Sequence, residues 1–356
     1  MKTLDLLKQL SEAPGPSGRE DTGDAAICAV TRALWEPLAD DLRTDALGNL
    51  IARQDGSGDA PRPAVMLAAH MDEIGLIVTG IEGQFLRVHA LGGTDRRILL
   101  GQEVMVHGRR ELPGVIGTRP PHVLTAAERK KIVPWDELFV DVGLPAAEVA
   151  AQVRVGDHIT FRRELAELKN RRVAGKALDN RAAVAILTLA LDALRRREHA
   201  WDVYAVATVQ EEVGIKGAIT SAYGLAPDLA VAVDMTFAQQ HDDGSNEIFE
   251  MDKGPTISVG PNLHPQVVAR LKSAANALEI PYQIEPVPGH SGTDAWGIQV
   301  AREGIPCGLV GIPVRYMHQP VETASLADIE RAGRLLAHFI AELAADYRPQ
   351  WEDEAE

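Results

Sequence analysis

The chain contains few of the residues on which several classes of protein depend. Among its 356 residues there are two cysteines, Cys28 and Cys307, which lie far apart and form no CxxC pair. This scarcity argues against a disulfide framework and against a cysteine-ligated zinc site, and it favours a reducing compartment. Aromatic residues make up only 4% of the chain, so aliphatic side chains must fill the core.

Positive charge is also scarce. Lys and Arg number 36 against 51 Asp and Glu, which gives a formal net charge of -15. A nucleic-acid partner requires a basic face, and anionic membranes attract basic clusters, so we expect neither partner. No apolar run approaches the roughly 18 residues that span a bilayer, and the start, MKTLDLLKQLSEAPG, lacks the apolar core of a signal peptide. We therefore expect a cytoplasmic location.

The patterning of the chain predicts an α/β fold with an insertion. Helical periods over residues 181–197, 264–278 and 326–347 alternate with short apolar strands, which indicates a mostly parallel sheet sandwiched by helices. Between about residues 75 and 161, short strand candidates instead alternate with glycine turns, as in a small β-domain. Within that region the stretch TRPPHVLTAAERKKIVPW is basic and rich in turn residues, so we expect an exposed loop there.

Four apolar strand candidates end on, or lead directly into, possible metal ligands. VMLAAH ends on His70, VYAVATVQ precedes Glu211 and Glu212, LAVAVD ends on Asp234, and GIPVRYM precedes His318. Open α/β sheets bind ligands in the crevice at the carboxyl ends of their strands, so this repetition indicates a site. Imidazoles and carboxylates without cysteine suit zinc, cobalt or manganese.

Two further aspartates extend this set, and each has a second interpretation. Asp72 follows His70 at i+2, so both side chains point to the same side of an extended chain. It could orient a ligating imidazole, or it could cap a turn. Asp179 begins the helix-like stretch DNRAAVAILTLALDAL, where it could bridge two cations or serve only as an N-cap.

Glu211 and Glu212 are adjacent carboxylates after a buried strand. Their mutual repulsion is costly unless cations or a proton intervene. Neighbours on an extended chain project in different directions, so one could ligate a cation while the other acts on the attacking water. This pair is the hardest to explain as purely structural.

The remaining candidates are ambiguous when each is considered alone. Asp234 could be a turn aspartate after a strand, and His318 could be a packed or exposed histidine. His122 and His290 could approach a cleft, but their spacing in the sequence places neither of them.

Seven motifs occur in the order seen in the tetrahedral (TET) aminopeptidases, a family of co-catalytic metallopeptidases that includes glutamyl aminopeptidases and proteins once labelled endoglucanases. They are HMDEIG, KALDNRA, EEVGIKGA, VDM, the GP of KGPTISVGP, SGTDA and RYMHQPVE. The middle of the chain is similar too, in GVIGTRPPHVL, LFVDVG and VRVGDHITF. The chain resembles this family over nearly its whole length.

The resemblance implies a zinc-peptidase-like phosphorylase/hydrolase fold. Residues 1–72 and 164–356 would form the catalytic α/β domain, and residues 73–163 would form an inserted, PDZ-like small β-barrel used in dimerisation. The dimers would assemble into a hollow tetrahedral dodecamer whose active sites face the interior.

The resemblance also implies two divalent ions per subunit, zinc or cobalt before manganese. One ion would be held by His70, Asp179 and Asp234, and the other by Asp179, Glu212 and His318, with Asp179 bridging them. Glu211 would be the general base, and Asp72 would orient His70. The implied activity is the release of N-terminal amino acids from peptide substrates.

Alternative functions remain open at this point. Another metallohydrolase reaction, such as deacylation or dipeptide cleavage, would use the same ligands. A glycosidase would need no metal but two carboxylates about 5–9.5 Å apart across a sugar. A non-catalytic assembly or binding protein could retain the ligands without turnover. The preferred N-terminal side chain is also open, because the stretch after Asp234, MTFAQQHDDG, departs from the family pattern.

Overall fold

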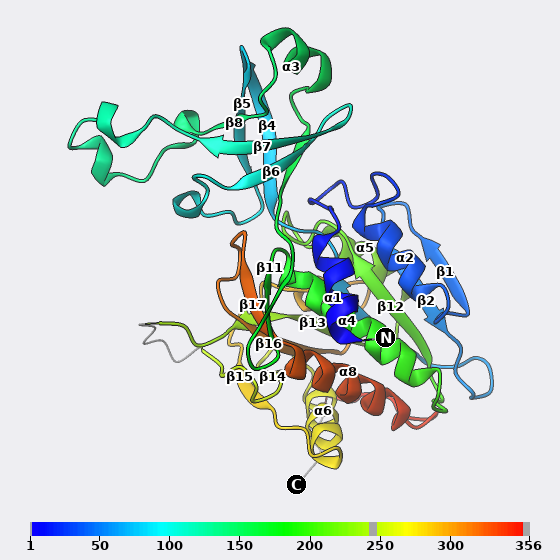
Figure 1. The fold of residues 1–356 in the computed structure, drawn as a ribbon. Helices are drawn as coiled ribbons and strands as arrows, with labels where there is room; N and C mark the ends of the chain where they lie inside the picture. Colours follow the sequence, from blue (N-terminus) through cyan, green and yellow to red (C-terminus); the bar gives the residue numbers. More distant parts are fainter. Residues whose placement is uncertain (1, 242–247, 352–356) are drawn as a thin grey trace.

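A computed structural model describes residues 2–241 and 248–351, and its largest element is an eight-stranded mixed sheet (Figure 1). In order across the sheet, the strands are β1 (Asp41–Thr44), β2 (Leu50–Gln54), β12 (Asp202–Thr208), β3 (Ala64–His70), β13 (Leu229–Phe237), β16 (Cys307–Val314), β14 (Thr256–Val259) and β15 (Gln283–Pro286). The last three residues of the stretch MTFAQQHDDG lie outside the described residues.

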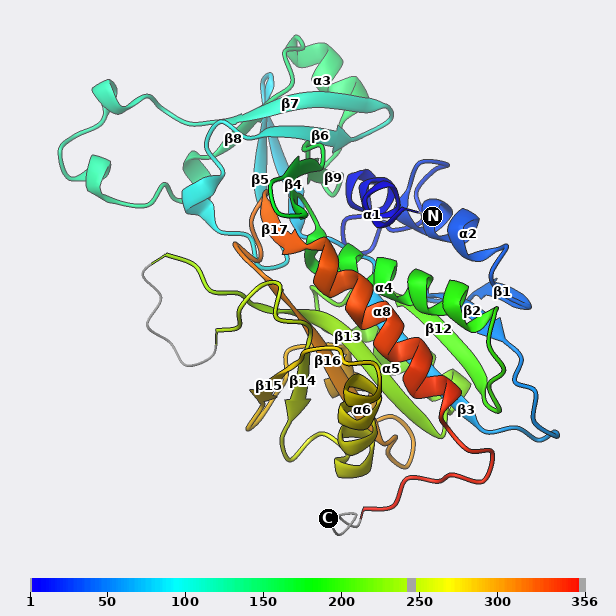
Figure 2. The same ribbon diagram turned by 60° about the horizontal axis from the view of Figure 1, so that its bottom comes forward.

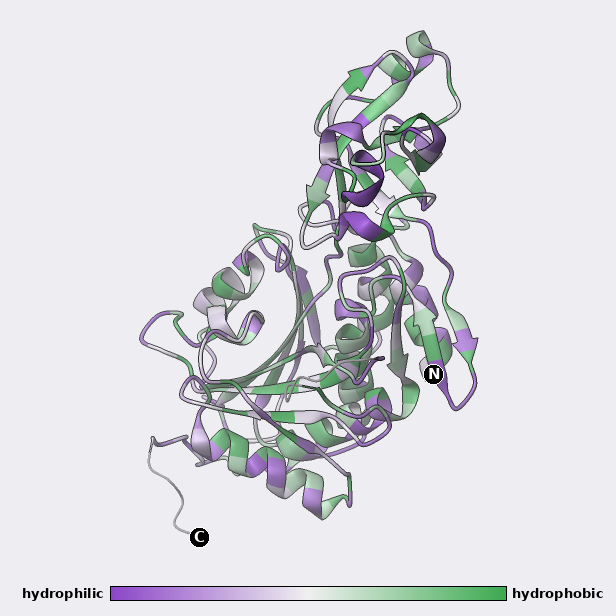
Figure 3. Ribbon diagram, turned by 90° about the vertical axis from the view of Figure 1, so that its left-hand side faces the viewer, coloured by the Kyte–Doolittle hydropathy of each residue, from purple (hydrophilic) through white to green (hydrophobic). Residues whose placement is uncertain are grey.

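The centre of this sheet is parallel, as the sequence predicts. Strands β12, β3, β13 and β16 pair in parallel, while β1 and β2 on one side and the β14–β16 pair on the other are antiparallel. The central strands are almost completely buried, which explains why they read as continuous apolar runs. The hydropathy colouring of Figure 3 shows many hydrophobic residues, in green, along the strands of the sheet. Because the four central strands are parallel, their carboxyl ends meet at one edge.

Helices cover both faces of the sheet (Figure 2). Helix α4 packs against α8 and α1, while α5 packs against α7 on the other face. The helices are α1 (Thr3–Glu12), α2 (Ile27–Trp35), α4 (Leu178–Leu194), α5 (Lys216–Leu225), α6 (Pro265–Ala277), α7 (Asp294–Ile298) and α8 (Leu326–Ala341).

In the described part of the chain, no helix combines the length and apolarity that a membrane crossing requires. Both cysteines are buried and unpaired, and the cytoplasmic location stays a prediction.

A closed six-stranded barrel stands beside the sheet and has its own hydrophobic core (Figure 1). Its strands, in order around the barrel, are β4 (Gly75–Glu82), β5 (Phe85–Leu91), β8 (Phe139–Asp141), β7 (Glu111–Gly117), β6 (Glu103–His107) and β9 (His158–Phe161). Closure leaves no free strand edge. The short helix α3 (Ala146–Gln152) precedes β9. The domain boundaries and the role in dimerisation derived from the resemblance stay predictions.

The basic stretch TRPPHVLTAAERKKIVPW forms a long loop that projects from the barrel (Figure 2). It contains the short 3-10 turns η2 (Pro121–Val123) and η3 (Glu128–Lys130), and a third turn, η4 (Trp135–Glu137), begins at its last residue. None of the residues in these turns is buried. An earlier 3-10 turn, η1 (Arg96–Ile98), lies between β5 and β6. The expectation of an exposed loop is confirmed.

A second, three-stranded sheet joins the segment that follows the barrel in the sequence to the C-terminal part of the chain. It consists of β10 (Ala166–Leu168), β11 (Arg172–Gly175) and β17 (Glu322–Ser325). β17 pairs antiparallel with β11, with Glu322 opposite Gly175. This pairing brings the segment that follows His318 next to the entry of helix α4.

Candidate metal centre

His70 is the last residue of β3, and its imidazole is buried among carboxylates. Nε2 of the ring lies 3.2 Å from Asp179 Oδ1, and 3.8 Å from both Asp234 Oδ1 and Glu211 Oε2. These residues come from four segments that are distant in the sequence. The predicted convergence at the carboxyl edge of the sheet therefore exists.

Asp179 lies between the two candidate histidine ligands. Its Oδ1 faces His70, while its Oδ2 lies 3.4 Å from Nε2 of His318. The backbone of Asp179 and Asn180 is not helical, and regular helix begins at Arg181. The side-chain amide of Asn180 donates to Val233 O at 2.9 Å and ties this turn to β13. Asp179 therefore presents one oxygen to each imidazole, the arrangement that a bridging carboxylate needs.

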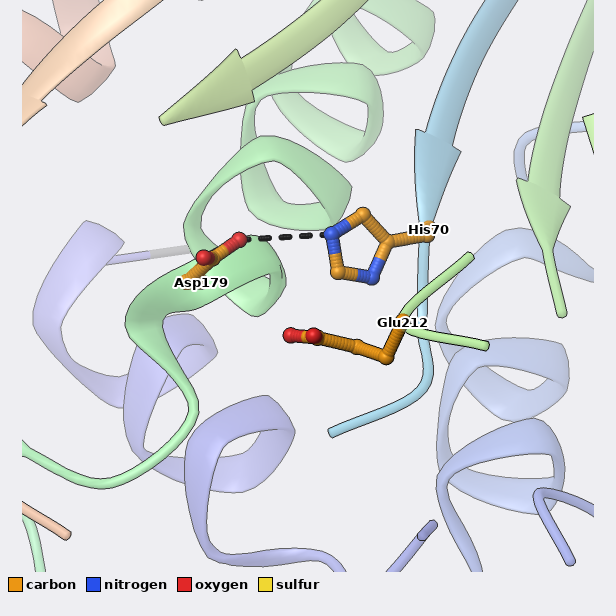
Figure 4. Close-up of side chains that lie close together, drawn as sticks. All are labelled: His70, Asp179 and Glu212. Atoms are coloured by element: carbon orange, nitrogen blue, oxygen red, sulfur yellow. Dashed lines mark ion pairs between the residues drawn. The ribbon is translucent and has the colours of Figure 1, made fainter. Parts of the chain in front are cut away.

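Glu212 completes a compact set of three. One ligand atom each from His70, Asp179 and Glu212 lies within 4.8 Å of the others (Figure 4). The Oε2 atom of Glu212 is also 3.6 Å from His318 Nε2. This set combines His70 from one of the two groups that the resemblance implies with Glu212 from the other, and Asp179 belongs to both groups, so the division of the ligands between two ions stays a prediction.

Asp72 connects the end of β3 to the turn after β12. Its Oδ1 accepts the backbone N–H of Glu211 at 3.0 Å, and its Oδ2 accepts that of Glu212 at 3.2 Å and the Ser17 hydroxyl at 2.5 Å. His70 Nδ1 lies 3.4 Å from Asp72 Oδ1 and 3.3 Å from the backbone oxygen of Asp72. Asp72 is therefore positioned to orient both the imidazole and the glutamate pair.

Two details of the sequence-based prediction need correction. Asp234 does not end its strand, because β13 continues to Phe237; its parallel pairing with β16 extends past the point where the apolar run stops. The interpretation of Asp179 as only an N-cap is also wrong, because regular helix begins two residues later, at Arg181, and the side chain of Asp179 faces the two imidazoles. Both errors arise because strand length and helix entry are decided here by tertiary contacts.

The electrostatics of the cluster favour bound cations. Burial and neighbouring carboxylates raise the pKa of Glu211 to about 8 and that of Glu212 to about 7, and burial raises the pKa of Asp234 well above its usual range. Contact with Asp179 raises the pKa of His318 to about 9. So many acidic groups resist ionising together unless positive charge lies among them.

The donor set itself fits divalent ions. Among the described residues, Asp179 Oδ1 is a buried oxygen that accepts no hydrogen bond, although His70 Nε2 is only 3.2 Å away. A buried carboxylate oxygen without a donor is costly and is satisfied by a cation. Two imidazoles with carboxylate oxygens, and no cysteine, are a donor set for zinc, cobalt or manganese.

Sequence reasoning assigned no role to Glu322, which supports both sides of the cluster. Its Oε2 accepts the backbone N–H of Asp179 at 2.8 Å, and its Oε1 accepts that of His318 at 3.0 Å. The side chain is buried. The feature of the sequence that could have identified Glu322 is an acidic residue four positions after His318, within the motif RYMHQPVE.

The sequence also assigned no role of its own to Asp294, which lies in the motif SGTDA. It is buried, and the Thr208 hydroxyl donates to its Oδ2 at 2.5 Å. Burial raises the pKa of Asp294 to about 6. Its negative charge is among the influences that raise the pKa of Glu211. Asp294 thus belongs to the electrostatic surroundings of the cluster.

A cavity of about 610 Å³ opens beside the cluster. Its lining includes five of the residues discussed above: His70, Asp179, Glu211, Asp234 and His318. Its other walls come from β13, β15, β16 and the segment 286–293. His290 lies in that segment and lines the cavity, whereas His122 lies on the exposed loop of the barrel.

Comparison with known proteins gives consistent results over most of the chain. The profile of the M42 glutamyl aminopeptidase family matches residues 48–335. The chain is 36% identical over 355 residues to a lysyl aminopeptidase of Pyrococcus furiosus, covering 98% of this chain and 100% of the relative.

Solved structures agree with this match. A TET aminopeptidase from the marine sediment archaeon Thaumarchaeota archaeon SCGC AB-539-E09 has a TM-score of 0.89 at 34% identity, with 96% of each chain covered. A TET peptidase of Pyrococcus horikoshii, which can assemble into a tetrahedron or a large octahedral shell, has a TM-score of 0.83 at 32% identity, with 96% of this chain and 100% of that chain covered.

Proposed function

Because this chain belongs to the M42 glutamyl aminopeptidase family, it is an aminopeptidase that uses divalent metal ions, and we propose that a two-cation centre with Glu211 as general base performs its reaction. The observation that carries this proposal is the position of Asp179, whose two carboxylate oxygens face two different imidazoles.

The proposed ligands divide into two sets that share one residue. The first set is His70, Asp179 and Asp234, and the second is Asp179, Glu212 and His318. Zinc or cobalt suits these donors best, with manganese as a third choice. When bound, the cations would anchor the free amino terminus, polarise the scissile carbonyl and lower the pKa of water.

The chain's own residues would then move the proton. Glu211 is proposed to take a proton from the attacking water and to pass it to the leaving amine. Its backbone N–H is fixed by Asp72 Oδ1 at 3.0 Å, and its Oε2 lies 3.8 Å from His70 Nε2. Asp72 is proposed as a positioning residue, because it contacts the His70 ring and both glutamate amides.

Chelation provides the direct test of this function. Removal of divalent ions should abolish hydrolysis of aminoacyl-nitroanilides, because the centre would lose its Lewis acid and its anchor for the amino terminus. Zinc, cobalt or manganese should restore it, and elemental analysis should count about two ions per chain.

Two outcomes would contradict the proposal. One is full turnover by protein from which elemental analysis detects no metal. The other is faster cleavage of N-acylated substrates than of those with a free amino terminus, which would favour a deacylase on the same ligands. Comparing the cleavage of a tripeptide with that of the dipeptide that shares its N-terminal residue separates an aminopeptidase, which cleaves both, from a dipeptidase, which cleaves only the dipeptide.

We also propose that the chain self-associates through its barrel into dimers and that the dimers form a tetrahedral dodecamer. The support is the assembly of the P. horikoshii relative and the exposed apolar side chains of Val115, Val123 and Ile132 on the barrel and its loop. Light scattering after gel filtration should then give the mass of twelve 38.4 kDa chains. A monomeric mass at micromolar concentration would contradict this assembly.

A further inference from the structure

Glu285, at one side of the cavity beside the candidate metal centre, has a carboxylate that the proposed reaction does not use. Glu285 is on strand β15 and lines the cavity. Its Oε1 accepts the Thr236 hydroxyl at 2.6 Å, and its Oε2 accepts the hydroxyls of Thr256 at 2.6 Å and Ser258 at 3.1 Å. Three donors from two other strands thus hold one carboxylate in a defined position.

Gly311 on β16 makes room for this arrangement. A Cβ atom there would collide with the Thr256 hydroxyl and would lie 3.0 Å from Glu285 Oε2. Only a residue without a side chain lets the glutamate reach from β15, across β14 and β16, to Thr236 on β13. The carboxylate therefore extends over the sheet to β13 and lines the cavity.

The carboxylate is close to the metal centre. Gly311 is the register partner of Asp234 on β13, and Thr236 lies two residues farther along the same strand. Residues i and i+2 point to the same face of a strand and are separated by about 7 Å. A substrate whose amino terminus is held near Asp234 would thus have Glu285 within the reach of a long first side chain.

Among the described residues, no cation pairs with the charge of Glu285. Within residues 2–241 and 248–351, the lining of the cavity includes no lysine or arginine, and Glu285 makes no ion pair in this part of the chain. A carboxylate that faces a cavity with hydroxyl donors on one side only is suited to receive a cationic group on the other.

We propose that Glu285 binds the ammonium group of the substrate's first side chain, so that the enzyme prefers peptides with N-terminal lysine. This inference rests on the aminopeptidase function proposed above. The stem of a lysine has four carbons, and the apolar side chains of Leu309, Met317 and Val287 line the same cavity. An N-terminal glutamate would instead bring a second negative charge to Glu285.

The hydrogen-bond pattern favours lysine over arginine. Each carboxylate oxygen has room for about two donors. Oε2 already accepts two hydroxyls, and Oε1 accepts one. The single remaining position suits a compact ammonium, whereas a guanidinium prefers to engage both oxygens of a carboxylate at once.

The test compares lysine with norleucine, which has the same four-carbon stem without the ammonium. The metal-loaded enzyme should show a higher kcat/KM for lysyl-nitroanilide than for norleucyl- or glutamyl-nitroanilide. Glu285→Gln keeps the size of the side chain but removes its charge. It should reduce the lysine-to-norleucine ratio by about 10- to 100-fold, the range for hydrogen bonds to charged groups, with little change in norleucine turnover.

A matched control and a binding measurement complete the design. Glu303→Gln removes the same charge at an exposed position outside the cavity, so it should leave the ratio unchanged. Calorimetry with the free amino acids provides a readout that does not depend on turnover. Lysine should bind the metal-loaded wild type more tightly than norleucine does, and Glu285→Gln should remove most of that difference.

Several results would overturn the inference while leaving the aminopeptidase function intact. Wild-type preference for norleucyl or glutamyl substrates would do so. An unchanged lysine-to-norleucine ratio in Glu285→Gln would also do so, and a lowered melting temperature in that variant would then assign the carboxylate to tying strands together. If the metal-loaded enzyme cleaved none of the substrates, the proposed function would fail, and the binding measurement would still test Glu285.

Discussion

Replacing Glu211 with glutamine is expected to remove nearly all turnover while the cations stay bound. Glutamine has the same shape, and Asp72 would still accept the backbone N–H of residue 211. The amide cannot take up a proton from the attacking water, however. Loss of a general base typically costs about 10²- to 10⁴-fold in rate. The measurement is kcat on the preferred aminoacyl-nitroanilide, with the metal content of the same sample determined by elemental analysis.

The neighbouring residue provides the control for this experiment. Glu212→Gln changes the same chemical group one position later, but Glu212 lies 3.6 Å from His318 and belongs to the proposed ligands. That variant should lose cation affinity as well as activity. If Glu211→Gln retained substantial turnover, or if the two variants lost metal equally, the assignment of base and ligand would have to be abandoned.

Replacing Asp179 with asparagine is expected to have the second large effect, the loss of both cations. Its two oxygens lie 3.2 Å from His70 Nε2 and 3.4 Å from His318 Nε2, so each proposed ion depends on it. Asparagine offers one acceptor oxygen and a neutral amide in place of two anionic oxygens. The negative charge of Asp179, which asparagine lacks, also offsets the repulsion between two ions about 3.5–4 Å apart. Metal content should fall from about two ions per chain to less than one, and turnover should fall with it.

A ligand of one ion only serves for comparison. His318→Ala removes a side chain that faces Asp179 and Glu212, so it should reduce the metal content by about one ion. Asp179→Asn protein that retained two ions, after circular dichroism had established that it folds, would rule out the bridging role. Loss of both ions from His318→Ala would show that the two positions are not independent.

The local features of the site could be read from the sequence because each depends on neighbours along the chain. The alternation of side chains places Asp72 and His70 on one side of the chain, and helical periodicity indicates a regular helix from Arg181. Polar residues after buried strands point to the edge of the sheet where ligands bind. These patterns involve separations of a few residues, and backbone geometry determines their consequences.

Other features could not be read in this way because they depend on contacts between distant segments. The strand that holds Asp234 extends to Phe237 because β16 pairs with it. Glu322 reaches the backbone of Asp179 across 143 positions of sequence. Ser17 reaches Asp72 across 55. No periodicity records these distances, and only a resemblance to a family could have suggested that such residues belong to a site.

The sequence by itself determined the composition and the local patterns of this protein: an acidic, aliphatic α/β chain with an inserted β-rich segment, and imidazoles and carboxylates close to apolar strands and to a helix entry. The tertiary structure alone decided how these residues are arranged. The hydrogen bonds of Asn180 to β13 and of Glu322 to the backbone of Asp179 help to place Asp179 between His70 and His318. The absence of a side chain at Gly311 lets Glu285 face the same cavity. The physical reason is that local propensities specify elements, whereas the approach of charged groups to within a few ångströms requires the burial and pairing of those elements against one another.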